Sequence, residues 1–174
     1  MPLYVVTFPR LSDGDRALVE DVRARFDPQH RAIAAHVTLL FAIERLGVDA
    51  LVSHVVTLTR GVAPFTCVFR RTLVAPDVAT AGSCVFLVPD EGSEELTRLH
   101  DALYSGALAA DLRPEIAFVP HITVARCGSA EEARSVAASL DARSFALRGR
   151  VDALEILIAV EGQAVRTARA IALA

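Results

Sequence analysis

The chain has 174 residues, of which 53% are hydrophobic and 22% are charged, a composition that suits one folded globular unit and excludes a disordered chain. All 18 basic residues are arginine, and the formal net charge of −3 argues against a protein that wraps duplex DNA. A single guanidinium group can still bind a phosphate through two parallel hydrogen bonds, so composition does not exclude small phosphorylated ligands.

Cysteine usage and hydropathy exclude further classes. Cys67, Cys84 and Cys127 are widely spaced without a C-x-x-C pair, which predicts neither a disulfide framework nor a zinc site. The segment MPLYVVTFPRL lacks the basic start and long apolar stretch of a signal peptide, and no apolar run reaches the length of a bilayer. We therefore expect a cytoplasmic protein without membrane contact, and we expect it to be a monomer.

The first half of the chain alternates strands and helices. Residues 3–8 are β-branched and aromatic and stop at Pro9, which is typical of a strand. Apolar residues at helical spacing then predict a helix with Asp13 as its N-cap. The first-half elements after the opening strand are a helix at 13–27, a strand at 35–43, a helix at 49–61 that ends at Gly61, and a strand at 64–76.

The second half restates this order. It opens with a strand that ends at Pro89, followed by a helix with Ser93 as N-cap and acidic residues in its first turn, where the helix dipole favours them. A later helix starts at Ser129. The second-half elements are strands at 83–90 and 117–127, helices at 93–112 and 129–142, one or two strands at 144–160, and a closing segment at 164–173. We predict an α+β fold of residues 1–174 with two pseudo-symmetric α/β lobes, whose antiparallel-rich sheets face a central cleft.

Two apolar strands, containing HVTLLF and HITVAR, each carry a histidine and a threonine two positions apart. Side chains alternate across a strand, so His36 and Thr38 share one face, and His121 and Thr123 share another. A lone histidine in an apolar strand is usually a satisfied core residue, but two matching pairs half a chain apart indicate one shared site. If the lobes face each other, the two imidazoles approach the same point from opposite sides.

Paired imidazoles suit the opening or forming of a phosphodiester. One neutral ring takes a proton from the attacking water or hydroxyl, and the other, protonated, gives one to the leaving oxygen. The threonine hydroxyls would hydrogen-bond the non-bridging phosphate oxygens. Neither motif brings a second histidine or a carboxylate at a metal-ligand spacing, so we predict no metal and no cofactor.

This pair of motifs resembles the two His-x-Thr signatures of the two-histidine (2H) phosphoesterase superfamily, in its 2′-5′ RNA ligase (cyclic phosphodiesterase) branch. The resemblance covers essentially the whole chain, because the order of strands and helices also matches. It implies metal-independent hydrolysis of a 2′,3′-cyclic phosphate, on a nucleotide or an RNA end, to a phosphomonoester. It also implies that His36 and His121 are the acid–base pair and that Thr38 and Thr123 bind the phosphate.

Arg126 follows the second motif, where many relatives also have arginine. By strict alternation it points away from His121, so a role at the phosphate requires a twist or bulge at the strand end, and the alternative is a surface ion pair. Phe86, Tyr4 and Phe118 are candidates to stack on a base, with core packing as the alternative.

The expected partner is a nucleotide or a short RNA end rather than long RNA, because aromatic residues are scarce: no Trp, two Tyr and eight Phe. Two other functions use the same residues. One is a nucleotide-binding module of the same fold without turnover, and the other is reversible 2′-5′ RNA ligation. Hydrolysis is downhill in water, which favours the cyclic phosphodiesterase.

Overall fold

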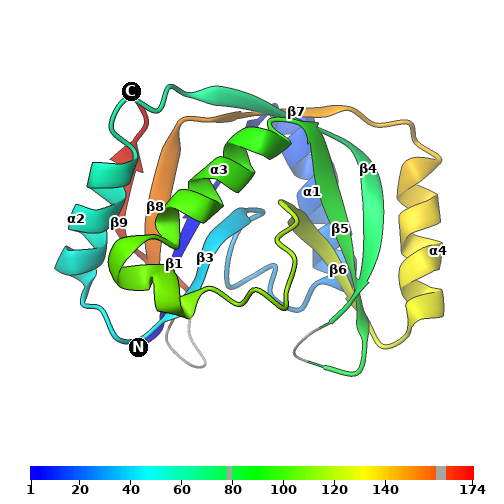
Figure 1. Ribbon diagram of the computed structural model, residues 1–174. Helices are drawn as coiled ribbons and strands as arrows, with labels where there is room; N and C mark the ends of the chain where they lie inside the picture. The colour runs from blue at the N-terminus through cyan, green and yellow to red at the C-terminus, as the bar shows by residue number, and fades with distance from the viewer. Residues whose placement is uncertain (78–79, 160–163) are drawn as a thin grey trace.

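The computed structural model describes residues 1–77, 80–159 and 164–174 (Figure 1). The strands are β1 (Leu3–Thr7), β2 (Arg10–Leu11), β3 (Val37–Ile43), β4 (Phe65–Pro76), β5 (Ser83–Glu91), β6 (Ile122–Cys127), β7 (Leu147–Val151), β8 (Ala153–Ile158) and β9 (Arg166–Ala172). The helices are α1 (Asp13–Phe26), α2 (Val48–Leu58), α3 (Ser93–Leu103) and α4 (Ala130–Asp141), and a 3-10 helix spans Gly106–Asp111.

The described strands form one curled antiparallel sheet in the order β2-β7-β4-β5-β6-β3-β1-β8-β9. This order is nearly palindromic about the junction of β3 with β6: β1 lies between β3 and β8, and β5 lies between β6 and β4. The two halves of the sheet meet through one residue pair, Val37 opposite Ile122. The two-lobed α+β prediction is confirmed, with the difference that the two sheets join at this pair into one.

The lobes do not coincide with the two halves of the chain (Figure 1). Helix α1 follows β1 and the short β2 and packs on β6, on the side of the β3–β6 junction opposite β1, whereas α3 follows β5 but packs on β3. Helix α2 contacts β8 and β9, whereas α4 contacts β4, β5 and β6. Each half of the chain therefore supplies strands and helices to both lobes, which ties the two histidine motifs to one folded unit.

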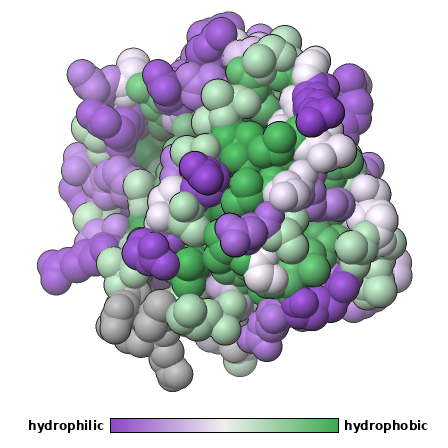
Figure 2. All heavy atoms as spheres, turned by 90° about the vertical axis from the view of Figure 1, so that its left-hand side faces the viewer, coloured by the Kyte–Doolittle hydropathy of each residue, from purple (hydrophilic) through white to green (hydrophobic). Residues whose placement is uncertain are grey.

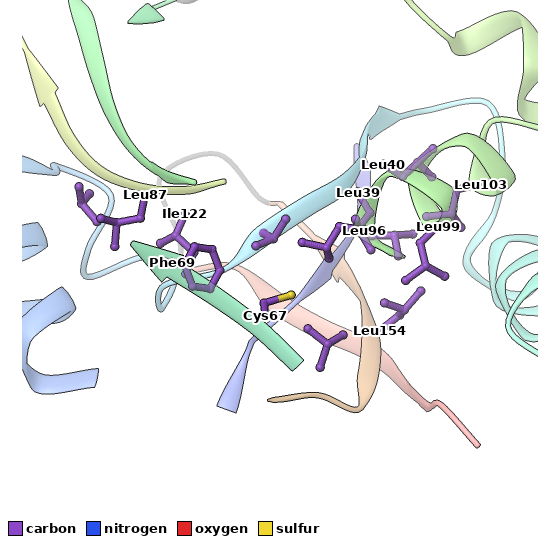
Figure 3. Close-up of a cluster of buried hydrophobic side chains, with 14 of the residues drawn as sticks. Leu39, Leu40, Cys67, Phe69, Leu87, Leu96, Leu99, Leu103, Ile122 and Leu154 are labelled. Carbon is purple, nitrogen blue, oxygen red and sulfur yellow. The ribbon is translucent and has the colours of Figure 1, made fainter. Parts of the chain in front are cut away.

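The core lies between the sheet and the helices (Figure 3). Leu39 of β3 lies near Leu96 and Leu99 of α3, while Ile122 of β6 lies near Phe69 of β4. All five side chains are buried, and burial of each such side chain contributes about 1.5–3 kcal/mol. The apolar residues of β3 and β6 thus face the helices, which leaves the opposite face of these strands for polar groups.

The outer face that carries α2 is partly apolar. Figure 2 shows hydrophobic side chains gathered in the middle of this face and hydrophilic ones around them. Val56 of α2 is one of the exposed large hydrophobic residues, at 38% exposure. None of the helices in the described ranges is both long enough and apolar enough to cross a membrane.

The predicted helix starts are correct at one of three caps. Ser129 caps α4, and its hydroxyl accepts a hydrogen bond from the Glu132 amide at 3.1 Å. Helix α1 is capped by Ser12 rather than Asp13, because the Ser12 hydroxyl lies 3.1 Å from the Asp15 amide. Helix α3 is capped by Gly92 rather than Ser93, with a φ of 82° that suits glycine.

Several predicted ends also differ from the structure. The helix predicted at 93–112 ends at Leu103, and the chain turns at Gly106, whose φ is 54°, into the 3-10 helix. Helix α2 ends at Leu58, before Gly61, and β5 continues past Pro89. Residues 144–160 contain the two strands β7 and β8, and position 160 lies outside the described residues. The two-residue strand β2 was not predicted.

Candidate active site

The antiparallel junction of β3 and β6 brings the two motifs side by side. Val37 pairs with Ile122, and both side chains are buried in the core. Continuing this antiparallel register by one residue in each direction sets His36 opposite Thr123 and Thr38 opposite His121. Residues opposite each other in a sheet lie on the same face. The predicted site residues are therefore brought together on the face that the core does not use: His36, Thr38, His121 and Thr123.

Each histidine immediately precedes its strand rather than lying within it, because β3 starts at Val37 and β6 starts at Ile122. The backbone carbonyl two residues upstream fixes each imidazole. His36 Nδ1 lies 2.8 Å from the Ala34 oxygen, and His121 Nδ1 lies 2.6 Å from the Val119 oxygen. A carbonyl only accepts, so Nδ1 carries the proton and Nε2 is the basic nitrogen of each neutral ring.

Burial lowers the pKa of both imidazoles. Desolvation is the largest cause for each, and the hydrogen bond to the backbone carbonyl acts in the opposite direction. The pKa of His121 falls to about 4, with smaller contributions from the positive charges of His36 and Arg126. Phe86 stacks on His121 with ring centroids 3.7 Å apart, whereas Phe8 lies 6.0 Å from His36 in a tilted arrangement. Without an added negative charge nearby, both imidazoles are neutral at pH 7.

A bulge in β6 turns Arg126 towards the histidine face. Val85 pairs with Ala125 and Phe86 pairs with Thr123, so Val124 is an extra residue on β6. Val124 and Ala125 are both buried, which changes the phase of the alternation, and the next side chain lies on the same face as Thr123. The bulge that a phosphate-facing Arg126 requires is therefore present.

The Arg126 guanidinium is surrounded by polar groups at long distances. Its Nε lies 3.6 Å from an Asp27 oxygen and its Nη1 lies 3.5 Å from an Asp77 oxygen. Nη1 also lies 3.6 Å from Cys84 Sγ, and Nη2 lies 3.4 Å from Gln29 Oε1. Both carboxylates are buried, so these contacts are not the surface ion pair that the sequence left open. The Nε atom is buried without a hydrogen bond to any described residue.

Sequence reasoning missed Phe41, which occupies the place in β3 that Arg126 occupies in β6. Val5 pairs with Leu40 and Val6 pairs with Thr38, so β3 carries the same bulge one residue after its threonine. Phe41 is 48% exposed although its ring is apolar. A signal was available: Phe41 and Arg126 each lie three positions after the threonine of their motif.

The three aromatic candidates have other positions. Phe86 uses one ring face against His121, and Phe118 stacks on His100 with centroids 3.8 Å apart. Tyr4 lies on β1 opposite Leu157 of β8, away from the junction of the motifs. Of these, Phe86 alone contacts a motif residue through its ring.

In the part of the chain that the structure describes, no three His, Cys, Asp or Glu side chains are grouped to hold a metal ion. A cavity of about 310 Å³ lies between α1 and α4, and its lining residues include Phe26, Val136 and Arg143 but none of the predicted site residues.

Comparison with known proteins agrees with the motifs. The 2′-5′ RNA ligase superfamily matches residues 11–163 of the chain. A Bacillus licheniformis protein named "Putative phosphoesterase" is 30% identical over 159 residues, which cover 90% of this chain and 89% of that protein.

Two solved structures share the fold. TT0787 of Thermus thermophilus matches with a TM-score of 0.68 and 22% identity, over 99% of this chain and 98% of that chain. E. coli LigT complexed with 3′-AMP matches with a TM-score of 0.60 and 18% identity, over 99% of both chains. The resemblance noted in the motifs is confirmed: the chain belongs to the 2′-5′ RNA ligase superfamily.

Proposed function

We propose that the protein is a metal-independent phosphodiesterase that hydrolyses a 2′,3′-cyclic phosphate, on a nucleotide or a short RNA end, to a phosphomonoester. The observation that supports this most directly is the pairing of Val37 with Ile122, which sets each motif histidine opposite the threonine of the other motif. Membership of a family that contains phosphoesterases supports the same class of reaction.

In the proposed reaction, the Nε2 of one neutral imidazole accepts a proton from water while the water oxygen attacks phosphorus. A bond forms between phosphorus and this oxygen, and the bond to one ribose oxygen breaks. The other imidazole, protonated, donates its proton to the leaving ribose oxygen, so the product is a monoester with a free hydroxyl. The two rings exchange protonation states in the step and return to the starting state by proton exchange with solvent.

The substrate supplies the charge that the acid requires. Desolvation lowers the pKa of His36 and of His121, so neither ring holds a second proton at pH 7 on its own. A cyclic phosphate carries one negative charge, and an anion within about 4–6 Å of an imidazole raises its pKa. Substrate binding is therefore coupled to the uptake of the catalytic proton.

The remaining groups on the same face can each bind one part of a nucleotide. The hydroxyls of Thr38 and Thr123 donate to non-bridging phosphate oxygens, where charge develops in the transition state. Arg126 lies within electrostatic range of both imidazoles and adds a cationic donor for the phosphate. The exposed ring of Phe41 offers a surface on which a base can stack. A nucleotide-sized ligand is also supported by E. coli LigT, a structure of which holds 3′-AMP.

The test is incubation with each of the four nucleoside 2′,3′-cyclic monophosphates in the presence of EDTA, with chromatography of the products. We expect turnover by the wild type and a loss of about 10²–10⁴-fold in kcat for His36→Ala and for His121→Ala, the usual effect of removing an acid or base. The matched control is His54→Ala, because His54 on α2 bonds to the Leu103 carbonyl at 2.9 Å, outside the site. Full activity in either motif variant, or binding of nucleotides without any turnover, would overturn the proposal.

A further inference from the structure

A buried arginine lies beside the segment that precedes His36. Arg23 on α1 is 1% exposed and is the one charged residue among the largest fully buried side chains of the described chain. Its guanidinium donates to the carboxylates of Glu20 at 2.9 Å and Asp27 at 3.0 Å. Because well-packed apolar residues often replace such a buried cluster without loss of stability, stability alone does not account for it.

The cluster makes hydrogen bonds to the backbone on both sides of Ala34. Arg23 Nη2 donates to the Ile33 carbonyl at 2.8 Å, and Glu20 accepts a hydrogen bond from the Ala35 amide at 2.7 Å. Between these two contacts lies the Ala34 carbonyl, which accepts the hydrogen bond from His36 Nδ1. The direction of that carbonyl, and with it the tautomer of His36, is therefore set by the buried ion cluster.

Asp27 connects the same cluster to the second motif. One of its oxygens accepts from Arg23, and the other lies 3.6 Å from Arg126 Nε. That second oxygen also accepts from the Gln29 amide at 3.0 Å, and the Gln29 side chain lies 3.4 Å from Arg126 Nη2. Asp27 is the C-cap of α1, where the helix dipole disfavours a carboxylate, and it is only 4% exposed. The two arginines offset the cost of this placement.

We propose that Arg23 and Asp27 are positioning residues for the site. Arg23, together with the Glu20 carboxylate that it holds, fixes the peptide whose carbonyl orients His36, and Asp27 holds Arg126 in place. Neither residue touches the reacting atoms. The kinetic consequences rest on the proposed function, whereas the orientation of His36 does not.

Arg23 and Asp27 act on the pKa of His36 with charges of opposite sign. The charges that act on it are those of Arg23 and Asp27 from α1 and of Arg126 from β6. The cation of Arg23 lowers the pKa of His36, and the anion of Asp27 raises it. Asp27→Asn is therefore expected to lower this pKa. Arg23→Met removes a cation but also loosens the Ala34 hydrogen bond, which raises the pKa, so the readout for Arg23 is the tautomer of His36.

The first experiment is an NMR titration of the imidazole nitrogens in the full chain. The signals of His36 are identified as those that are missing from the spectrum of His36→Ala. We expect the wild type to show the Nδ1–H tautomer of His36, and Arg23→Met to show a mixture of tautomers. The matched control is Arg16→Met on the same helix, because Arg16 is exposed and pairs with the exposed Asp13, at 2.8 Å. An unchanged tautomer in Arg23→Met, whatever the pKa, would overturn the role of Arg23.

Kinetics on a 2′,3′-cyclic nucleotide separate the two roles. Arg23→Met is expected to lower kcat by about 10²-fold with little change in KM, because a misplaced imidazole loses its alignment with the substrate. Asp27→Asn is expected mainly to raise KM, through Arg126. Arg23→Lys retains the charge, but one ammonium cannot replace the planar fork, so kcat is expected to stay low.

Two outcomes keep the proposals distinguishable. If the wild type turns over no cyclic phosphate, the proposed function fails, and the NMR titration still decides the positioning role. If Arg23→Met does not fold, Arg23→Lys decides instead, and a wild-type tautomer with wild-type kcat in that variant would overturn the role of Arg23.

Discussion

The stacking of Phe86 on His121 leads to a quantitative prediction. The ring centroids are 3.7 Å apart with the planes at 20°, and desolvation is the largest cause of the lowered pKa of His121. The pKa is about 4, against 6.5 for an ordinary histidine. This difference of about 2.5 pH units corresponds to roughly 3 kcal/mol against the charged ring.

Phe86→Ala opens one face of the imidazole to water. We expect the pKa of His121 to rise by at least about one unit, because desolvation decreases. It should not reach 6.5, since the positive charge of Arg126 remains, as does that of His36 once its ring is protonated. The assay is an NMR titration of the His121 ring, and the acid limb of the kcat/KM profile should move to higher pH by a similar amount.

The matched variant is Phe8→Ala, because Phe8 lies 6.0 Å from His36 and is the corresponding aromatic neighbour of the other motif. It is expected to shift the pKa of His36 and to leave that of His121 near its wild-type value. A His121 pKa that stays near 4 in Phe86→Ala would refute desolvation by the stacked ring. An equal shift of His121 in Phe8→Ala would refute a local effect.

Three further predictions concern stability. The folded-state pKa of His121 lies below its unfolded value, so the unfolded chain binds the proton first as pH falls. The free energy of unfolding should therefore fall by about 3 kcal/mol as pH drops from 6.5 towards 4. Urea titrations at a series of pH values should show this fall, and His121→Ala should reduce it. Gly92→Ala should cost at least about 2 kcal/mol, because φ is +82° and the added Cβ would lie 2.5 Å from the Thr66 oxygen. A Cβ added at Gly14 would have no atom within 4 Å, so Gly14→Ala should change stability by no more than about 1 kcal/mol. Thermal melts of both variants measure the two costs, and equal costs would contradict the steric argument. Ser129→Ala removes the hydroxyl that caps α4 and should cost about 1 kcal/mol, whereas an unchanged melting temperature would show that the cap is dispensable.

Some features of the site are local and could be predicted from the sequence. Alternation along a strand places a histidine and the threonine two positions later on one face, whatever the strand pairs with, and this holds for both motifs. The repeated order of strands and helices similarly predicted two related lobes. Serine capping of α4 was predictable because a cap depends on residues a few positions apart.

Other features depend on which segments meet, and only the tertiary structure decided them. The bulges that turn Arg126 and Phe41 to the histidine face are defined by the register against β5 and β1, which local alternation does not encode. The burial of Arg23 was not predicted from the sequence, because it arises where α1 packs against β6. The lowered pKa values arise in the same way, because desolvation depends on every atom packed around a ring. The sequence alone determined what chemistry each motif offers. Tertiary packing decided how the motifs, their charges and their supporting residues are arranged, because register and burial are properties of contacts between distant segments.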